Sequence, residues 1–232
     1  MTDTSTDLDP TASPTRPDID LRCADVASLF GEVAGARIVH ADPPWDYGGR
    51  ENCRGDGTRS GLEYAVFGYD TVLAHLDAAY DCAADDSYLL LWTTWPHLAL
   101  WLDAARGKMR WRYLSGGAWA KTGGIGVGLH WRGDSEPLLL YGKGKPRPRV
   151  RNLRNTYVGP RTRHSVKPEP WLASMFSTFS QPGDLVFDLY AGLGSAARAC
   201  ASTERRYVGA ELDPARHAEA MRLLAEGIQK GE

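Results

Sequence analysis

Two patterns of apolar and polar positions alternate along this chain: unbroken apolar runs, and apolar residues at helical spacing. Short apolar runs with no polar break are typical of strands buried on both faces. They occur at 38–41, 87–92, 184–189 and 207–211. Between them, apolar residues recur every three or four positions, the spacing of a helix with one buried side, as at 169–179. The chain therefore alternates predicted strands with predicted helices.

Weaker patterns complete this picture. They predict strands at 19–23, 111–120 and 136–141, and helices at 26–33, 70–80, 93–106, 195–201 and 214–227. Asp70 is placed to cap its helix and Gly35 to end the first one. The glycine-rich stretches 48–61 and 123–128 are expected to be loops. Strands alternating with helices predict an α/β fold with a mostly parallel sheet.

Composition changes this picture only at its margins. Residues 1–18 are rich in Thr, Asp and Pro and lack an apolar core, so we expect a disordered lead followed by a single domain over 19–232. No apolar run is long enough to span a membrane. The four cysteines are widely spaced, which predicts reduced thiols in a cytoplasmic protein and no metal site. A net charge of −2 means that any nucleic-acid surface must be local.

The strand at 38–41 ends in an unusual tetrapeptide, Asp42-Pro43-Pro44-Trp45. Ligands of open α/β sheets bind at the carboxyl ends of strands. Two prolines hold the backbone rigid, so the Asp42 carboxylate and the Pro43 carbonyl become fixed acceptors beside a flat indole. Such acceptors suit the two N–H groups of an amine on a planar base. Taken alone, the tetrapeptide is equally consistent with a plain proline turn.

A second motif follows the strand at 184–189, which ends at Asp188 and enters the sequence Tyr190-Ala191-Gly192-Leu193-Gly194-Ser195. Glycines there let a backbone approach a ligand closely, and the following helix offers free N–H groups. Glu211 ends the next predicted strand, where an acid can accept hydrogen bonds from ribose hydroxyls. The motif therefore predicts a nucleoside cofactor, with NAD and S-adenosylmethionine as candidates. The amine-binding tetrapeptide favours the second.

With these motifs in this order, the chain resembles the S-adenosylmethionine-dependent adenine-N6 methyltransferases. It is most similar to the beta-class DNA enzymes and the mRNA adenosine methyltransferases, which carry a D-P-P-aromatic motif and a glycine-rich cofactor loop. His164-Ser165-Val166-Lys167-Pro168 resembles their H-S-x-K-P segment. The resemblance spans roughly residues 19 to 225. It implies a Rossmann-like methyltransferase fold with a circularly permuted motif order.

The resemblance also assigns roles to residues. Asp42, Pro43, Pro44 and Trp45 would be catalytic, with Trp45 stacking on the adenine. The cofactor would be lined by a larger set, namely Asp25, Asp42, His164, Ser165, Lys167, Asp188, Tyr190, Ala191, Gly192, Gly194, Ser195 and Glu211. No metal is implied. Cytosine-N4 enzymes usually carry Ser where Asp42 stands, which favours adenine.

The segment 143–168 holds nine basic residues and no acid. Between the two motifs, it is predicted to overhang their shared cleft and bind phosphates. Eight of these residues are candidate nucleic-acid ligands: Lys143, Lys145, Arg147, Arg149, Arg151, Arg154, Arg161 and Arg163. The segment is short compared with the target-recognition domains of the DNA enzymes, which argues against strong sequence specificity.

The prediction is therefore DNA adenine-N6 methylation, with a homodimer or partner subunit left open. Within the same chemistry, RNA is the alternative, since Trp45 and the segment 129–147 resemble the mRNA-modifying branch. Other classes are a non-catalytic nucleic-acid-binding subunit, against which the intact Asp42 and glycine loop argue, and a NAD-dependent oxidoreductase, which has no evident use for the tetrapeptide. Of the remaining residues, Trp92, Trp95, Trp101 and Trp111 are expected in the core or an interface, and His130, Trp131, Arg132 and Glu136 are candidates for the cleft.

Overall fold

The computed structural model describes residues 18–45, 67–123, 130–161 and 166–229. The predicted lead at 1–18, apart from Asp18, the loop at 48–61 and most of the loop at 123–128 lie outside the described residues. So do three candidate ligands, Arg163, His164 and Ser165.

A single mixed sheet organises the described chain, in the order β1-β8-β7-β2-β3-β5-β4-β6. Its strands are β1 (Ile19–Cys23), β2 (Ala36–Ala41), β3 (Ala83–Trp92), β4 (Arg112–Thr122), β5 (Ser135–Lys143), β6 (Thr156–Pro160), β7 (Leu185–Asp188) and β8 (Arg206–Glu211). Only β5 is antiparallel to its neighbours, so the other described strands all run in one direction. This confirms the predicted α/β fold with a mostly parallel sheet.

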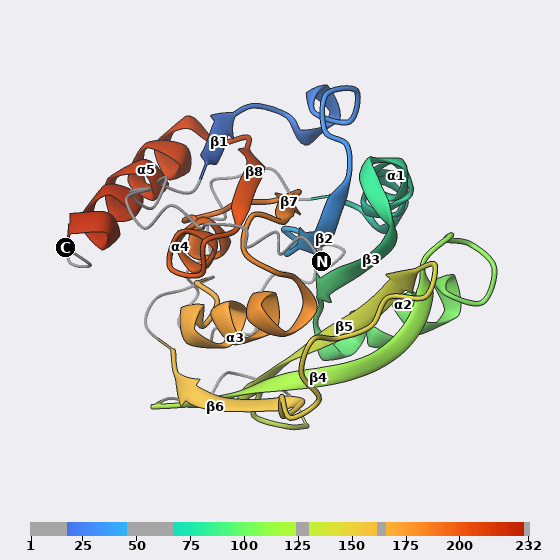
Figure 1. The fold of residues 1–232 in the computed structure, drawn as a ribbon. Coiled ribbons are helices and arrows are strands. Elements are labelled where there is room, and N and C mark those ends of the chain that lie inside the picture. The colour runs from blue at the N-terminus through green and yellow to red at the C-terminus, as the bar shows by residue number, and fades with distance from the viewer. Residues whose placement is uncertain (1–17, 46–66, 124–129, 162–165, 230–232) are drawn as a thin grey trace, which may run out of the picture.

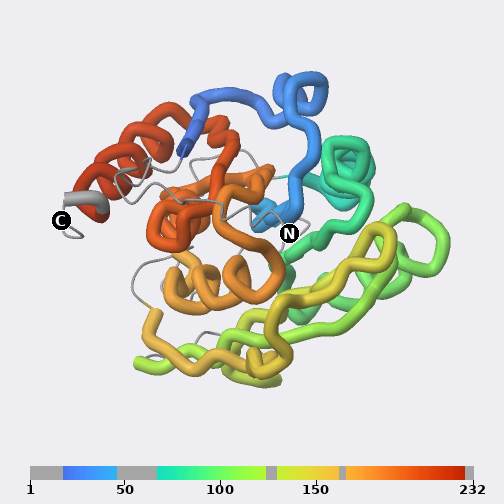
Figure 2. Tube along the Cα trace, viewed as in Figure 1, coloured from blue at the N-terminus to red at the C-terminus, as the bar shows by residue number. Residues whose placement is uncertain are grey.

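Helices cover both faces of this sheet (Figure 1). They are α1 (Tyr69–Cys82), α2 (Leu98–Ala104), α3 (Glu169–Phe179), α4 (Ser195–Ala201) and α5 (Pro214–Gln229). The first two pack on one face and the last three on the other. The chain trace brings the two ends of the domain together, because β1 pairs in parallel with β8 (Figure 2).

Two cores follow from the double-sided burial. Consecutive strand residues point to opposite faces, so Val39 joins the core under α1 and α2 while Ile38 joins the core under α3, α4 and α5. Leu90 and Leu91 on β3 divide in the same way. All four side chains are 0% exposed. The uninterrupted apolar runs of the sequence are therefore explained by burial on both faces.

Three predicted helices differ from the structure. The helix expected at 26–33 is a 3₁₀ turn, η1 (Val26–Ser28), which still buries Val26, Leu29 and Val33 in the first core. The apolar spacing therefore correctly marks the buried residues, but one short turn is enough to bury them. Helix α1 begins at Tyr69 after Gly68, so Asp70 lies in its first turn and does not cap it.

The third helix that differs follows β3, and the basic segment holds a strand that was not predicted. The helix expected at 93–106 divides into the 3₁₀ turn η2 (Trp95–His97), which holds Pro96, and α2. The basic segment is not irregular throughout, since β6 pairs in parallel with β4 along the sheet border. The sequence does not predict this strand, because prolines, glycines and arginines surround it and it has no apolar run.

Candidate active site

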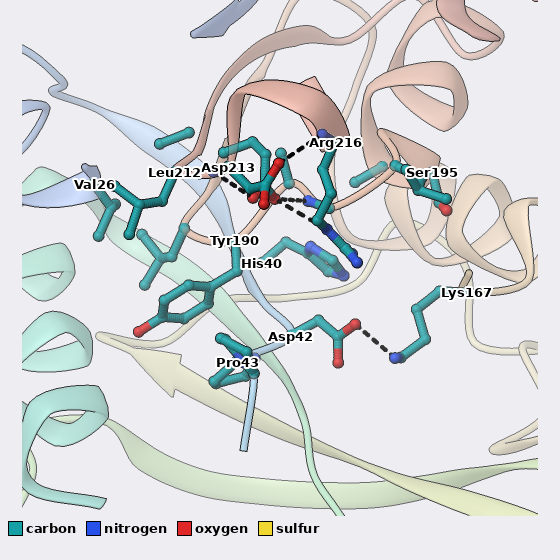
Figure 3. Close-up of a pocket in the computed structure, with 18 of the residues that line it drawn as sticks. Val26, His40, Asp42, Pro43, Lys167, Tyr190, Ser195, Leu212, Asp213 and Arg216 are labelled. Atoms are coloured by element: carbon teal, nitrogen blue, oxygen red, sulfur yellow. Dashed lines mark hydrogen bonds and ion pairs between the residues drawn. The ribbon is translucent and has the colours of Figure 1, made fainter. Parts of the chain in front are cut away.

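A cavity of about 550 Å³ opens where β1, β2, β7 and β8 end (Figure 3). These strands are parallel, so their carboxyl ends meet at one edge of the sheet. That edge gathers Asp25, Asp42, Tyr190 and Glu211, which come from four separate parts of the chain. The cavity therefore lies where open α/β sheets bind their ligands.

The tip of β2 presents a carboxylate that is paired with a lysine. Lys167 Nζ lies 2.6 Å from Asp42 Oδ2, and the two side chains are 9% and 22% exposed. Burial raises the pKa of Asp42, although the positive charge of Lys167 opposes this. Burial by itself would lower the pKa of Lys167, but Asp42 and Glu136 outweigh it, so this pKa is raised. Asp42 is thus an acceptor held in place by a permanent cation.

Glu136 and Lys121 extend this pair into a chain of alternating charges. Glu136 Oε2 lies 3.4 Å from Lys167 Nζ, and its other oxygen accepts a hydrogen bond from Lys121 Nζ. Burial raises the pKa of Glu136, but the two lysines outweigh it and the net shift is downward. Glu136 enters the cavity because it stands near the start of β5, the reversed strand, at the carboxyl edge. The sequence indicates Glu136 only as a candidate for the cleft, and it gives no sign that Lys121 belongs there.

The rest of the tetrapeptide is rigid and partly enclosed. The Pro44 carbonyl accepts a hydrogen bond from the Phe67 N–H at 2.9 Å. Within the described residues, no backbone N–H donates to the Pro43 carbonyl. Trp45 is 8% exposed, and its ring stacks on His97 with centroids 5.1 Å apart. One face of the indole is therefore covered by protein, although Trp45 still lines the cavity.

The glycine loop forms the opposite wall of the cavity. Gly192 has a φ of +56°, a conformation that favours glycine, and its N–H donates to Glu211 Oε2 at 2.8 Å. The other Glu211 oxygen accepts from the Asp213 N–H at 3.0 Å. Burial raises the pKa of Glu211, against the opposing effect of these amides and of Arg216. Two backbone amides therefore hold the Glu211 carboxylate in place, and each of its oxygens has one further lone pair that can accept a hydrogen bond.

Behind that wall, a buried network joins the two halves of the site. His40 Nδ1 lies 2.9 Å from Asp188 Oδ1, while His40 Nε2 accepts from Trp92 Nε1 at 3.0 Å. The tautomer follows, because Nε2 is an acceptor and Nδ1 must carry the proton. Tyr207 donates its hydroxyl to Asp188 Oδ2 at 3.0 Å.

Two of the predicted cofactor ligands do not line the cavity. Asp188 is 0% exposed and does not line the cavity, because its carboxylate already binds His40, Tyr207 and the Tyr190 N–H. Gly194 is also absent from the lining and instead precedes α4, with a φ of +75°. Of the described candidates, the residues that do line the cavity are Asp25, Asp42, Pro43, Pro44, Trp45, Lys167, Tyr190, Ala191, Gly192, Ser195 and Glu211.

Two of these lining side chains have local partners. Asp25 Oδ1 accepts the Ala27 N–H at 2.9 Å and thereby starts η1. The Tyr190 hydroxyl lies 2.8 Å from His75 Nδ1 on α1, and burial raises the pKa of that hydroxyl. Burial also lowers the pKa of His75.

The basic segment is not placed as predicted. Strand β5 runs away from the cavity, so Lys143 at its end lies at the opposite edge, where its ammonium group donates to the carbonyls of Tyr80 and Ala83. The Lys145 amide donates to Asp86 nearby. Strand β6 then returns along the sheet to the cavity edge. Of the described candidates for nucleic-acid binding, only Arg161 lines the cavity.

Two further expectations concern metals and membranes. Among the residues that the structure describes, no group of three or more His, Cys, Asp or Glu side chains is placed to hold a metal ion. In the same part of the chain, no helix is long and apolar enough to cross a membrane.

Sequence comparison places residues 154–222 in a family model described as DNA methylase, N6_N4_Mtase. The type II methyltransferase M.MunI of Mycoplasma sp. is 33% identical over 157 residues, which are 57% of this chain. The chain spans 62% of that relative's length.

Solved structures share the fold. The M1.HpyAVI–SAM complex matches with a TM-score of 0.70 and 15% identity over 89% of this chain and 99% of that one. TTHA0409 of Thermus thermophilus, a putative DNA modification methylase, matches with a TM-score of 0.67 and 20% identity over 90% and 96% of the two chains. The cytosine-N4-specific PvuII DNA methyltransferase matches with a TM-score of 0.71 and 10% identity over 92% and 93%. Part of the chain is therefore similar in sequence to DNA methylases, and its fold is shared with solved DNA methyltransferase structures.

Proposed function

We propose that the protein transfers a methyl group from S-adenosylmethionine to the 6-amino group of adenine in DNA. One observation carries the proposal. The rigid acceptor Asp42 and the wall formed by Gly192 and Glu211 face the same cavity. A methyl donor held by the glycine loop would then lie beside an amine held by Asp42, which is the arrangement that methyl transfer needs.

The cavity is suited to a nucleoside cofactor in size and in chemistry. Its volume of about 550 Å³ falls within the usual range for small-ligand sites. Glu211 has lone pairs left for ribose hydroxyls, and the left-handed Gly192 keeps the wall free of a side chain. S-adenosylmethionine is bound in two solved structures of related fold, the M1.HpyAVI complex and a complex of TTHA0409.

When bound, S-adenosylmethionine supplies a methyl group on a positively charged sulfur, and the C–S bond breaks with its electron pair remaining on sulfur. The task of the protein is to prepare the amine. The lone pair of an adenine amino group is delocalised into the ring, so the nitrogen is a weak nucleophile. By accepting its N–H groups, Asp42 and the Pro43 carbonyl would draw the nitrogen towards tetrahedral geometry. The raised pKa of Asp42 makes its carboxylate a better acceptor for the proton released after transfer.

Adenine is favoured over cytosine by Asp42 itself, since cytosine-N4 enzymes usually carry Ser there. The fold does not separate the two, because the PvuII enzyme is cytosine-N4-specific and matches as well as the others. RNA remains a second candidate substrate on account of Trp45 and the segment 129–147.

Asp42→Ala and Asp42→Asn test the proposal. Each variant is incubated with labelled S-adenosylmethionine and separate pools of DNA and RNA, and the methylated nucleosides are identified by mass spectrometry. We expect N6-methyladenine in DNA with the parent protein and none with either variant, while cofactor binding in a thermal-shift titration is largely kept. Asp103→Asn, an exposed carboxylate paired with Lys108, is the matched control.

Three results would contradict the proposal. Near-normal methylation by Asp42→Ala would remove Asp42 from the reaction. N4-methylcytosine as the product would reassign the target base, and a product found only in the RNA pool would reassign the polymer.

A further inference from the structure

We infer that two exposed tryptophans, Trp95 and Trp131, form the surface on which the target nucleic acid rests at the mouth of the cavity. We call this pair the tryptophan platform. The inference rests on the proposed function and identifies the residues that would hold its polymer substrate.

Exposure sets these two side chains apart. Trp131 is 88% exposed and Trp95 is 52% exposed, whereas Trp92, Trp101 and Trp111 are 1% exposed or less. Sequence analysis expected Trp95 in the core or an interface. A solvent-exposed indole leaves a large apolar surface in water, which is typical of residues that pack against a partner.

The platform adjoins the cavity. Trp95 directly follows Thr94, which lines the cavity, and its Nε1 donates to Ser135 Oγ at 3.2 Å. Ser135 in turn precedes Glu136, another lining residue. This hydrogen bond ties the segment after β3 to the start of β5.

Topology places Trp131 at the same edge. The connection from β4 to β5 leaves the sheet at Thr122 and re-enters it at Ser135, and both positions lie at the carboxyl edge. The backbone is anchored there because the Lys121 N–H donates to the Asp134 carbonyl at 2.6 Å. Trp131 stands three residues before Asp134, so the edge that holds Asp42 also carries both tryptophans.

Charge favours a nucleic acid as the occupant. Exposed Arg132 follows Trp131, and exposed Arg161 lines the cavity. Asp134, two residues after Arg132, is an exposed acid on the same connection. Guanidinium groups beside aromatic rings match a phosphate backbone with unstacked bases, because the cations bind phosphates and each indole accepts the face of a base.

Single-stranded or locally opened DNA fits this platform better than an intact duplex. The target base must leave its stack to reach Asp42, and its neighbours then lose a stacking partner. Trp95 and Trp131 can replace that partner. Stacking tolerates any base, which agrees with a chain that has little sequence between its motifs for a target-recognition domain.

Fluorescence anisotropy of a labelled single-stranded DNA oligonucleotide, with a duplex of the same sequence alongside, tests the platform. We expect Trp95→Ala and Trp131→Ala each to raise the Kd for the single strand about ten-fold, and Trp131→Phe to keep most of the affinity. Tyr113→Ala, which removes an aromatic residue that is 41% exposed near the start of β4, is the control and should bind as the parent does. Circular dichroism verifies that each variant folds.

The readouts separate the platform from the proposed function. Weaker binding by the tryptophan variants without any methylation by the parent would retain the platform and reject the activity. Unchanged oligonucleotide affinity in both alanine variants would overturn the platform even if methylation were intact. A concentration-dependent dimer that Trp131→Ala abolishes, with unchanged DNA affinity, would instead make this surface a contact between two copies of the chain and would also overturn it.

Discussion

The two walls of the cavity differ in the chemical groups that form them. The β2 wall consists of side-chain charges, with Asp42 and Glu136 each within ion-pair distance of Lys167. The β7–β8 wall consists of backbone, since the Gly192 and Asp213 amides hold Glu211. The carboxylate at the end of β7, Asp188, is completely buried and does not line the cavity.

This difference suggests that the β2 wall carries out the reaction and that the β7–β8 wall shapes the cofactor site. Asp42 and Asp188 end neighbouring strands, yet one faces the cavity and the other bonds only with protein groups. We therefore expect changes in the β2 wall to alter rate and pH dependence, and changes in the β7–β8 wall to alter stability and cofactor affinity.

The largest effect is expected from Asp188→Asn. The amide cannot accept from both His40 and Tyr207 without bringing its own N–H group against a donor, so a buried donor loses its partner. We expect a loss of about 3 kcal/mol in the free energy of unfolding, measured by urea denaturation. Asp103→Asn on the surface should change it by less than about 0.5 kcal/mol. Equal stability of the two variants would mean that Asp188 is not structural.

Lys167→Met should change the pH dependence of the reaction. The cation that opposes the upward shift of the Asp42 pKa is lost, so this pKa should rise further. Only ionised Asp42 is purely an acceptor for the amine, so activity falls as the pH drops through this pKa. We expect the acid limb of kcat/KM to move upward by about one pH unit, equivalent to about 1.4 kcal/mol. Lys167→Arg keeps the charge and should leave the limb nearly in place; an unmoved limb in the methionine variant would contradict the pairing.

Gly192→Ala should weaken the cofactor more than it slows the reaction. An alanine at a φ of +56° is strained, and its Cβ would lie 3.2 Å from Arg216 Nη2. We expect about ten-fold weaker binding of S-adenosylmethionine in isothermal titration calorimetry, with kcat at saturating cofactor reduced much less. Gly31→Ala, where nothing lies within 4 Å of the added Cβ, is the matched control. A large loss of kcat with unchanged affinity would place Gly192 in the chemistry instead.

The smallest effect concerns the basic segment. Arg161 lines the cavity, whereas Arg154 is exposed and lines only a separate hollow beside α3. We expect Arg161→Ala to reduce the slope of log Kd for DNA against log salt by about one, and Arg154→Ala to leave it unchanged. Equal reductions would restore the whole segment as a phosphate-binding surface.

Local patterns predicted the parts of the site that depend on strand ends. Asp42, Gly192 and Glu211 each follow or end a marked strand, and parallel strands bring such ends together. Sequence could not reveal where the basic residues lie, because that depends on the reversal of β5 and on the unmarked strand β6. It also could not separate Asp188 from the cofactor, since its partners His40 and Tyr207 lie in strands whose order is set by tertiary structure.

The position of β2 within the sheet has a consequence for motion. This strand is hydrogen-bonded to β7 on one side and to β3 on the other. Neighbouring strands lie about 4.8 Å apart, so the distance between the Asp42 turn and the glycine loop is fixed by one strand spacing. The strand ends that carry the two motifs cannot shift relative to each other without breaking this ladder, and the amides of β2 should be among the slowest to exchange with deuterium. Any adjustment for the reaction must therefore come from the substrate base and from segments outside the sheet.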